Sequence, residues 1–271
     1  MEAILFKAAL LGYLVATLGY TASLMVKRVV IARATVWLLL AAFAIHGLSL
    51  ALRCLSRGLP PAVHPYETLS FFAWAMTGTY LAFQLKTKTQ VLGAFVSPLA
   101  FLLMVVASSR LGVDVPVPDI LKGTLVPVHV ALSVTGEALL AIACGAGILY
   151  LAQDSQIRRR KMTPMSRYLP SLDDLDRVNH ISLLTGFALL TAGLLVGSVW
   201  ASTVWGRPWP WDPKLLWTLA AWFFYAVLIH QRLAIGWKGR KIALLSIAAF
   251  AVLLFAFVGV SSFFKTVHRF Q

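Results

Sequence analysis

The chain has 271 residues, of which 59% are hydrophobic and 13% are charged, and its mean hydropathy is +0.81. No water-soluble domain of this length could bury so much apolar surface, which excludes a soluble protein. The formal net charge is +14, but the basic residues are spread over several short loops. This distribution argues against nucleic-acid binding and favours contact with anionic lipid headgroups.

Long apolar runs predict how the chain crosses the membrane. A bilayer core of about 30 Å needs about 20 apolar residues per helical crossing. We therefore predict an all-α, polytopic transmembrane bundle of about eight helices, built as a single membrane domain over residues 1–271. The first run is too long for the apolar part of a secretory signal, so it is interpreted as a retained helix. The predicted crossings are residues 3–26, 34–54, 67–85, 90–109, 125–152, 180–203, 213–231 and 242–264.

The basic residues also predict the orientation of these helices. Of the 24 Lys and Arg residues, fifteen lie in the connections on one side and eight on the other. The positive-inside rule then places both termini outside. The four connections with the basic excess are residues 27–33, 86–89, 153–179 and 232–241.

Two features of the predicted bundle, Glu137 and the loop 153–179, each allow two interpretations. Glu137 lies in the fifth crossing, about 12 Å deeper than His129. An intramembrane carboxylate is costly, so it either hydrogen-bonds His46 or moves protons, or it is protonated and packed. The loop 153–179 fits a short amphipathic helix on the inner face, with Leu172 and its neighbours packed downward, as well as it fits a solvated linker.

The ten residues 205–214, which run from the end of the sixth crossing into the first turn of the seventh, are rich in large aromatic side chains, prolines and charges. They form the centre of a tryptophan-rich segment (residues 200–217) that the predicted topology places on the outer face. Such a segment suits a large planar amphiphile, although an interfacial aromatic belt is the alternative. Its informative residues are Trp205, Arg207, Trp209, Trp211, Asp212 and Lys214.

The histidines indicate what the planar ligand is. His129 and His268 fall on the same face as the tryptophans, and two imidazoles can occupy both axial positions of haem iron. Aromatic rings could contact the porphyrin and nearby cations could pair with its propionates. Zinc usually needs three or four converging ligands at close spacing, and no HxxxH, HExxH or paired-cysteine pattern occurs. A porphyrin explains the tryptophans, whereas zinc does not.

The segment from Val199 to Lys214, followed by a helix that ends in Ile-His230-Gln-Arg, resembles the WWD signature of the haem-handling superfamily that includes CcsA (ResC), CcmC and CcmF. Three further stretches resemble the same proteins, and their order and spacing match over roughly residues 60–271. These stretches are Pro65 to Trp74, Leu125 to Val130 and Asp176 to Phe187.

The resemblance implies a function in cytochrome c maturation. His129 and His268 would be the axial ligands of a haem b that the WWD segment holds at the outer face, and His230 would ligate haem on its way across the membrane. The haem would be joined through thioether bonds to a CxxCH apocytochrome c, with a CcsB-like subunit completing a holocytochrome c synthetase complex in the bacterial inner membrane. The haem site would face the periplasm. No catalytic residue is predicted, because the chain offers no nucleophile or acid–base pair for this step and whether it acts alone stays open.

His180 and His230 lie at similar depth near the inner ends of two antiparallel helices, which fits either an inner haem site or two unrelated polar residues. Leu215 stands where synthetases usually have glutamate, and the ending at His268 is shorter than theirs. This ending and His180 resemble HemX-type proteins, which are linked to the control of haem synthesis. Three functions therefore compete: haem presentation for cytochrome c maturation, HemX-type regulation or haem chaperoning, and transport without haem.

Overall fold

The computed structural model is entirely helical over the residues that it describes, which are 1–26, 29–57, 64–86, 90–109, 111, 121, 123–160, 169–206 and 212–260. These residues form eight α-helices and one short π-helical stretch, and they contain no β-strand. The predicted all-α class is confirmed. The elements are α1 (Glu2–Val26), α2 (Val29–Arg57), α3 (Pro65–Lys86), α4 (Gln90–Ser108), α5 (Leu125–Arg158), α6 (Leu172–Trp205), α7 (Pro213–Leu233), α8 (Arg240–Leu254) and η3 (Phe255–Gly259).

Seven of the described helices are long and apolar enough to cross a membrane. The exception is α3, which has 22 residues but carries several Thr, Ser and Gln side chains along its length. A multi-pass membrane protein is therefore confirmed, and a crossing by α3 stays a prediction. Because every backbone polar group must be satisfied inside a bilayer, continuous helices are the form that such apolar runs adopt.

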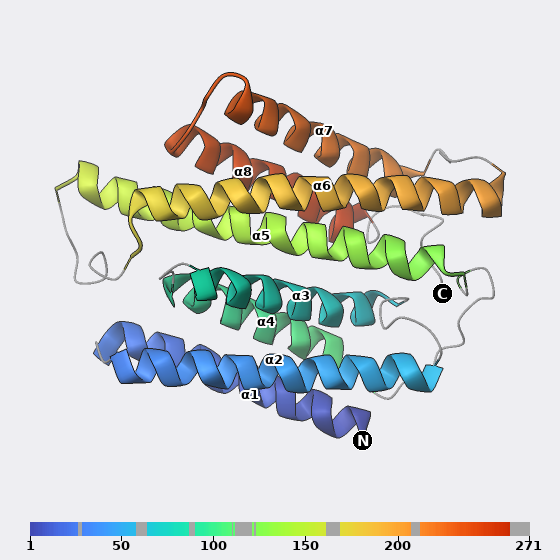
Figure 1. Cartoon of the computed structure of the whole chain (residues 1–271), viewed down its shortest axis with the longest axis horizontal. Coiled ribbons are helices and arrows are strands. Elements are labelled where there is room, and N and C mark those ends of the chain that lie inside the picture. Colours follow the sequence, from blue (N-terminus) through green and yellow to red (C-terminus); the bar gives the residue numbers. More distant parts are fainter. Residues whose placement is uncertain are drawn as a thin grey trace. The chain divides into compact units, whose positions relative to one another are not determined.

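Residues Met1–Val117 and Arg159–Asp174 make one compact unit, which contains α1 to α4. Within it α1 packs against α2 and α4, and α3 packs against α4 and α2 (Figure 1). Small residues allow these close approaches. The Cβ of an alanine at Gly12, for example, would lie 2.7 Å from the Cβ of Ala42 on α2.

A chain of polar side chains crosses the interior of this unit. His46 is fully buried, and its Nδ1 lies 3.1 Å from the Tyr13 hydroxyl while its Nε2 lies 2.9 Å from the Ser70 hydroxyl. The Ser70 hydroxyl in turn donates to the Met104 sulfur at 3.7 Å. Both ring nitrogens of His46 therefore have hydrogen-bond partners within this unit.

A buried ion cluster ties three helices of the same unit together near the start of α1. Arg53 donates from Nη1 to Glu2 at 2.6 Å and from Nε and Nη2 to Glu67 at 2.8 and 2.5 Å. Its side chain is only 13% exposed, so the two carboxylates offset the cost of burying the guanidinium. The cluster fixes α1, α2 and α3 to one another at this level.

Residues Pro118–Arg158 and Leu175–Gln271 make the second compact unit, which contains α5 to α8. In this unit α8 packs against α5 and α7, and Gly136 of α5 meets the backbone of α6 near Gly186. The core draws on all four helices, and Trp222 of α7 donates from its indole to the Thr191 hydroxyl of α6 at 2.9 Å. Its buried residues are Leu140, Ala143, Leu183, Leu190, Ala221, Tyr225, Leu228, Ile242, Ala249 and Leu253.

The start of α6 differs from the prediction. Leu172 to Val178 form its first two turns and not a separate surface helix, and both Leu175 and Val178 are fully buried. Ser171 caps this start: its hydroxyl accepts from the backbone N–H of Asp174 at 3.1 Å and donates to the Asp174 carboxylate at 2.6 Å. The same loop is shortened from the other side, because α5 continues to Arg158.

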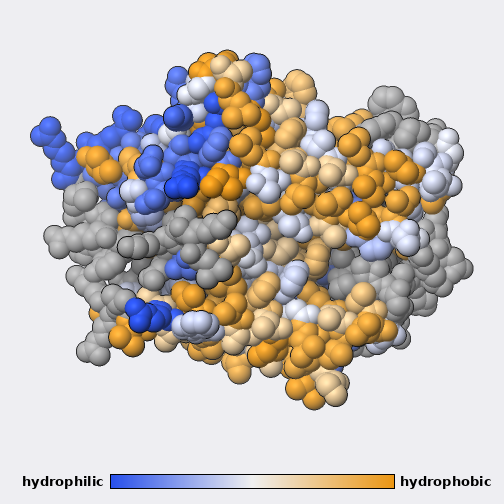
Figure 2. All heavy atoms as spheres, viewed as in Figure 1, coloured by the Kyte–Doolittle hydropathy of each residue, from blue (hydrophilic) through white to orange (hydrophobic). Residues whose placement is uncertain are grey.

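One end of the second unit is rich in ion pairs and exposed cations. Arg232 is buried beside Asp176 at 2.6 Å, and Asp154 contacts both Arg158 and Arg240. Hydrophilic residues gather at this end of the space-filling view, while hydrophobic residues cover the middle of the helices (Figure 2). This distribution is typical of a bundle whose ends reach the lipid headgroups.

Candidate functional site

Two helix ends lie within the tryptophan-rich segment, and Asp212 caps the second of them. This residue has an extended backbone, with φ −111° and ψ 134°, and its carboxylate accepts from the Lys214 N–H at 3.1 Å. Pro213 occupies the first helical position, where its missing N–H costs nothing. Asp212 is 3% exposed, and its role here is to begin α7 within the segment.

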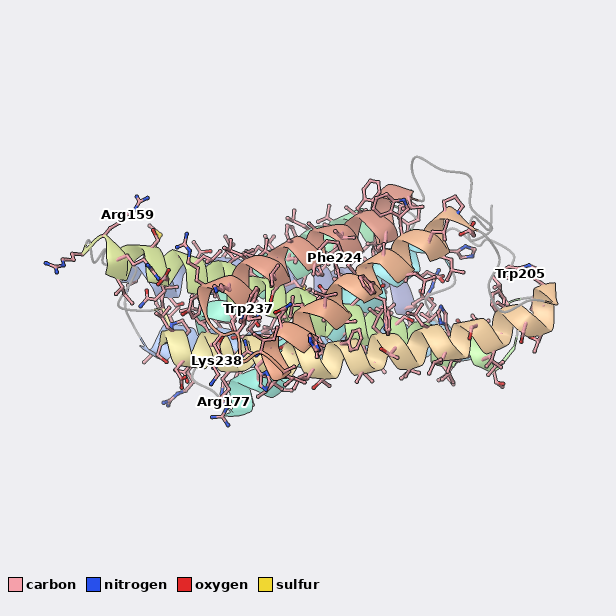
Figure 3. The ribbon with its side chains drawn as sticks, turned by 90° about the horizontal axis from the view of Figure 1, so that it is seen from above. Arg159, Arg177, Trp205, Phe224, Trp237 and Lys238 are labelled. Atoms are coloured by element: carbon pink, nitrogen blue, oxygen red, sulfur yellow. The ribbon has the colours of Figure 1, made fainter. Side chains whose placement is uncertain are left out.

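Trp205 is the last residue of α6 and forms the first of these two helix ends. Its ring lies edge-on to Trp200, with the two ring centroids 5.0 Å apart. Gly206 follows with a φ of +68°, a conformation that glycine adopts without strain, and this ends the helix. Figure 3 shows Trp205 at one end of the α5–α8 unit, and Arg177, Trp237 and Lys238 near the other.

His129 lies in the first turns of α5 and points at α6. Its Nδ1 is 2.7 Å from the backbone carbonyl oxygen of Gly193. A carbonyl only accepts, so Nδ1 must carry the proton and donate it. The neutral ring therefore has its lone pair on Nε2, which is the nitrogen that a metal-binding histidine with such a bond presents.

Lys214 lies in the first turn of α7, where the sequence predicts a partner for a haem propionate. Its ammonium interacts electrostatically with the carboxylates of Glu137 and Asp212. The ammonium also lies 5.9 Å from the centroid of the Phe257 ring. A basic side chain therefore lies at the start of α7, within the tryptophan-rich segment.

The two inner histidines have different surroundings. His180 Nδ1 accepts from Nε of Arg232 at 2.7 Å, and the same guanidinium donates to Asp176. Because arginine is a donor only, the neutral His180 ring carries its proton on Nε2 and its one lone pair faces Arg232. His230 is exposed in the last turn of α7. A haem held by both histidines would require Arg232 to leave His180.

Four of the predicted ligand-binding residues lie outside the described residues. They are Arg207, Trp209, Trp211 and His268. Among the residues that the structure does describe, no group of three or more His, Cys, Asp or Glu side chains could hold a bare metal ion.

Comparison with known proteins assigns the family. The family model described as Cytochrome C assembly protein matches residues 62–268, about three quarters of the chain. The chain belongs to the cytochrome c assembly protein family. The matched range includes α3 to α8, the whole tryptophan-rich segment, and His129.

Several curated relatives named cytochrome c biogenesis protein CcsA are similar to this chain. The protein of Pyropia yezoensis is 28% identical over 262 residues, which cover 82% of each chain. That of Prochlorococcus marinus subsp. pastoris is 30% identical over 243 residues, covering 79% of this chain and 77% of its own. That of Chlamydomonas reinhardtii is 32% identical over 218 residues, covering 78% and 60% respectively.

The described part of this cytochrome c assembly family member fits a haem group. His129 offers an imidazole whose proton is fixed on Nδ1 by the Gly193 carbonyl. Lys214 supplies a cation for a carboxylate, and Trp200 and Trp205 supply apolar rings at the same end of the unit. These are the three kinds of contact that a porphyrin with propionates needs.

Sequence reasoning missed the residues that set the two tautomers. The Gly193 carbonyl comes from a residue 64 positions away from His129, and Arg232 is 52 positions from His180. The carbonyl leaves no side-chain signal in a sequence. Arg232 begins the basic connection 232–241, and its burial between Asp176 and His180 cannot be read from the pattern of loops.

Proposed function

We propose that this chain binds haem b at the outer face of the membrane and presents it for covalent attachment to apocytochrome c. The observation that carries the proposal is the hydrogen bond from His129 Nδ1 to the Gly193 carbonyl, because a metal-binding imidazole commonly has such a bond on one nitrogen and ligates through the other. The family and the relatives named CcsA support the same process.

Each residue of the proposed site has a role that its chemistry allows. His129 and His268 hold the iron from its two faces, and Trp205, Trp209 and Trp211 cover the ring. Arg207 and Lys214 pair with the propionates, and Asp212 holds the start of α7 in place so that Lys214 keeps its position. Bound there, haem would supply the groups that form thioether bonds with the two thiols of a CxxCH segment.

The chain's own contribution to that step is positioning. None of the proposed site residues is a nucleophile for thioether formation, so the rate gain would come from holding haem and the apocytochrome thiols at a fixed geometry. The apolar rings of the tryptophans would also exclude water from the reacting groups. We therefore assign no catalytic residue, and the proposed contribution of this chain is to present haem to the apocytochrome.

A second part of the proposal concerns His230 and a CcsB-like partner subunit. His230 follows Phe223 and Val227 at spacings that place all three on one face of α7. Phe223 is 63% exposed and Val227 is 41% exposed, and the neighbouring Phe224 is labelled on α7 in Figure 3. A polar ring on an apolar membrane face indicates a binding partner, so we propose that a helix of the partner subunit covers this face and that haem passes His230 between the two chains.

The partner surface is tested by cysteine crosslinking in a background without native cysteines. Val227→Cys should crosslink to the CcsB-like subunit when the two are expressed together. Leu244→Cys on α8 is the control, because Leu244 is exposed to a similar degree and belongs to another helix. Equal crosslinking from both positions, or none from Val227→Cys, would reject α7 as the partner surface.

The function itself is tested by deleting the gene and following covalent haem. We expect cytochromes c to disappear from haem-stained gels while haem b proteins keep their usual absorbance. Normal cytochromes c with altered levels of haem precursors would favour the HemX-type function. Purified protein without any Soret band would favour transport without haem.

A further inference from the structure

The contact between α5 and α6 is made by small residues at three successive levels. Gly136 meets the backbone of Leu190, with a hypothetical Cβ 2.8 Å from its nitrogen. One step toward the outer end, a Cβ at Gly193 would lie 2.3 Å from the Ser133 hydroxyl. At the third level Gly197 meets a side chain and not a backbone, and that side chain is His129.

Gly197 lies directly against the imidazole ring. A Cβ at this position would be 2.6 Å from His129 Nδ1 and 2.7 Å from its Cε1. Real Cβ atoms do not approach other heavy atoms so closely, so any side chain at position 197 would displace the ring. The ring therefore occupies the space that a side chain would fill on an ordinary helix.

The same glycine also exposes the acceptor of the His129 hydrogen bond. Each Cα–Cβ bond in a helix tilts toward the N-terminus, so a side chain at position 197 would lean over the carbonyl of Gly193 four residues earlier. That carbonyl is inside α6, yet it accepts the imidazole N–H at 2.7 Å with its second lone pair. Without a side chain at 197, a donor on α5 can reach it.

We propose that Gly197 is a positioning residue: it seats the His129 imidazole on α6 and opens the Gly193 carbonyl to it, which fixes the ring orientation and the tautomer that presents Nε2 to haem iron. This inference rests on the proposed function for the part that concerns haem. The packing of the His129 ring against Gly197, called the seat below, is a property of the chain without ligand. The two parts are therefore tested separately.

The seat is tested by a double-mutant cycle on thermal unfolding of the full-length, haem-free protein in detergent. Gly197→Ala should lower the midpoint by several degrees when His129 is present, because the methyl group and the ring compete for one space. In a His129→Ala background the same change should cost nothing, since alanine is the better helix former once the ring is gone. An equal drop in both backgrounds would overturn the seat.

Gly136→Ala is the matched control for helix packing. Its methyl group would meet α6 backbone and not His129. Its cost should therefore be the same with and without His129. If Gly197→Ala alone fails to fold but Gly197→Ala with His129→Ala folds, the ring is the cause and the seat is supported.

The ligand role is tested on haem-loaded protein by electron paramagnetic resonance, normalised to bound haem. Gly197→Ala should shift the low-spin signal or convert part of it to high spin, while Gly136→Ala should leave the g values of the remaining haem unchanged. A Gly197→Ala spectrum identical to wild type would overturn the inference even where His129→Ala abolishes the signal. If His129→Ala also leaves the spectrum unchanged, the ligand assignment fails, and the unfolding cycle still decides the seat.

Discussion

Buried polar side chains in this chain depend on particular partner residues. Arg232 shows the point: its side chain is 6% exposed and is held by Asp176 and by His180. A charge buried this deeply is tolerated only while both partners remain. The hydrogen bond from Arg232 also sets the His180 tautomer, so this tautomer depends on both residues.

Removing Arg232 should therefore be severe. Arg232→Met leaves Asp176 without its ion-pair partner, and we expect a loss of about 3–5 kcal/mol in the free energy of unfolding. Denaturation in mixed detergent and denaturant measures it. Arg240→Met is the control, because Arg240 is 53% exposed beside Asp154 and its pair should contribute only about 0–1 kcal/mol. Equal losses from both variants would show that burial of Arg232 does not matter.

Asp212 can be separated into a cap and a charge. Asp212→Asn keeps a side-chain oxygen that can accept from the Lys214 N–H, so α7 should keep its stability. Asp212→Ala removes the acceptor and should cost about 1 kcal/mol. Thermal unfolding of both variants, together with their haem content, makes the distinction. Asn behaving like Ala in both measurements would assign Asp212 an electrostatic role in place of capping.

At the scale of helices, hydropathy predicts where the chain enters and leaves the bilayer and little beyond it. The predicted crossings for α1, α4 and α7 agree with the structure to within a few residues, because their apolar runs end where the helices end. The helices α5 and α6 continue past the apolar runs, since Asp154 and Asp176 have ion-pair partners and Ser171 supplies a cap. The position of Gly197 against His129 was also beyond prediction, because helix rotation decides which side chain a glycine faces.

The hydrogen-bonded side chains that link α1 to α4 can be tested for their contribution to helix packing. Tyr13→Phe removes the hydroxyl beside His46 Nδ1 and leaves that nitrogen buried without its partner. We expect a loss of about 1–3 kcal/mol in the free energy of unfolding. Combining it with His46→Leu removes the unpaired group, so the double variant should be less destabilised than the sum of the two single changes. Simple additivity would indicate that the hydrogen bond does not hold these helices together.

At the scale of the whole molecule, two compact helical units divide the chemistry of the chain. The unit of α1 to α4 contains interior polar contacts that are internally satisfied, namely His46 and the Arg53 cluster. The unit of α5 to α8 contains His129, Asp212 and Lys214 at one end and the Arg232 cluster at the other. The two ends of this unit therefore differ in their chemistry, and the proposed haem site uses only one of them.

The predicted orientation is open to a direct labelling experiment. In a chain without its two native cysteines, Gly123→Cys should react with a membrane-impermeant maleimide in intact cells. Lys238→Cys should react only after the membrane is permeabilised, because the basic end of α7 and α8 is predicted to lie inside. The reverse pattern would place the tryptophan-rich segment on the inner face and refute presentation of haem outside.

The central claim is that His129 ligates haem iron through Nε2, with Nδ1 held by the Gly193 carbonyl. It is tested most directly by the low-temperature electron paramagnetic resonance spectrum of ferric full-length protein, compared between wild type and His129→Ala at equal bound haem. The predicted result is a low-spin signal with two imidazole ligands in wild type and its loss in His129→Ala. The same low-spin signal in both proteins would contradict the claim.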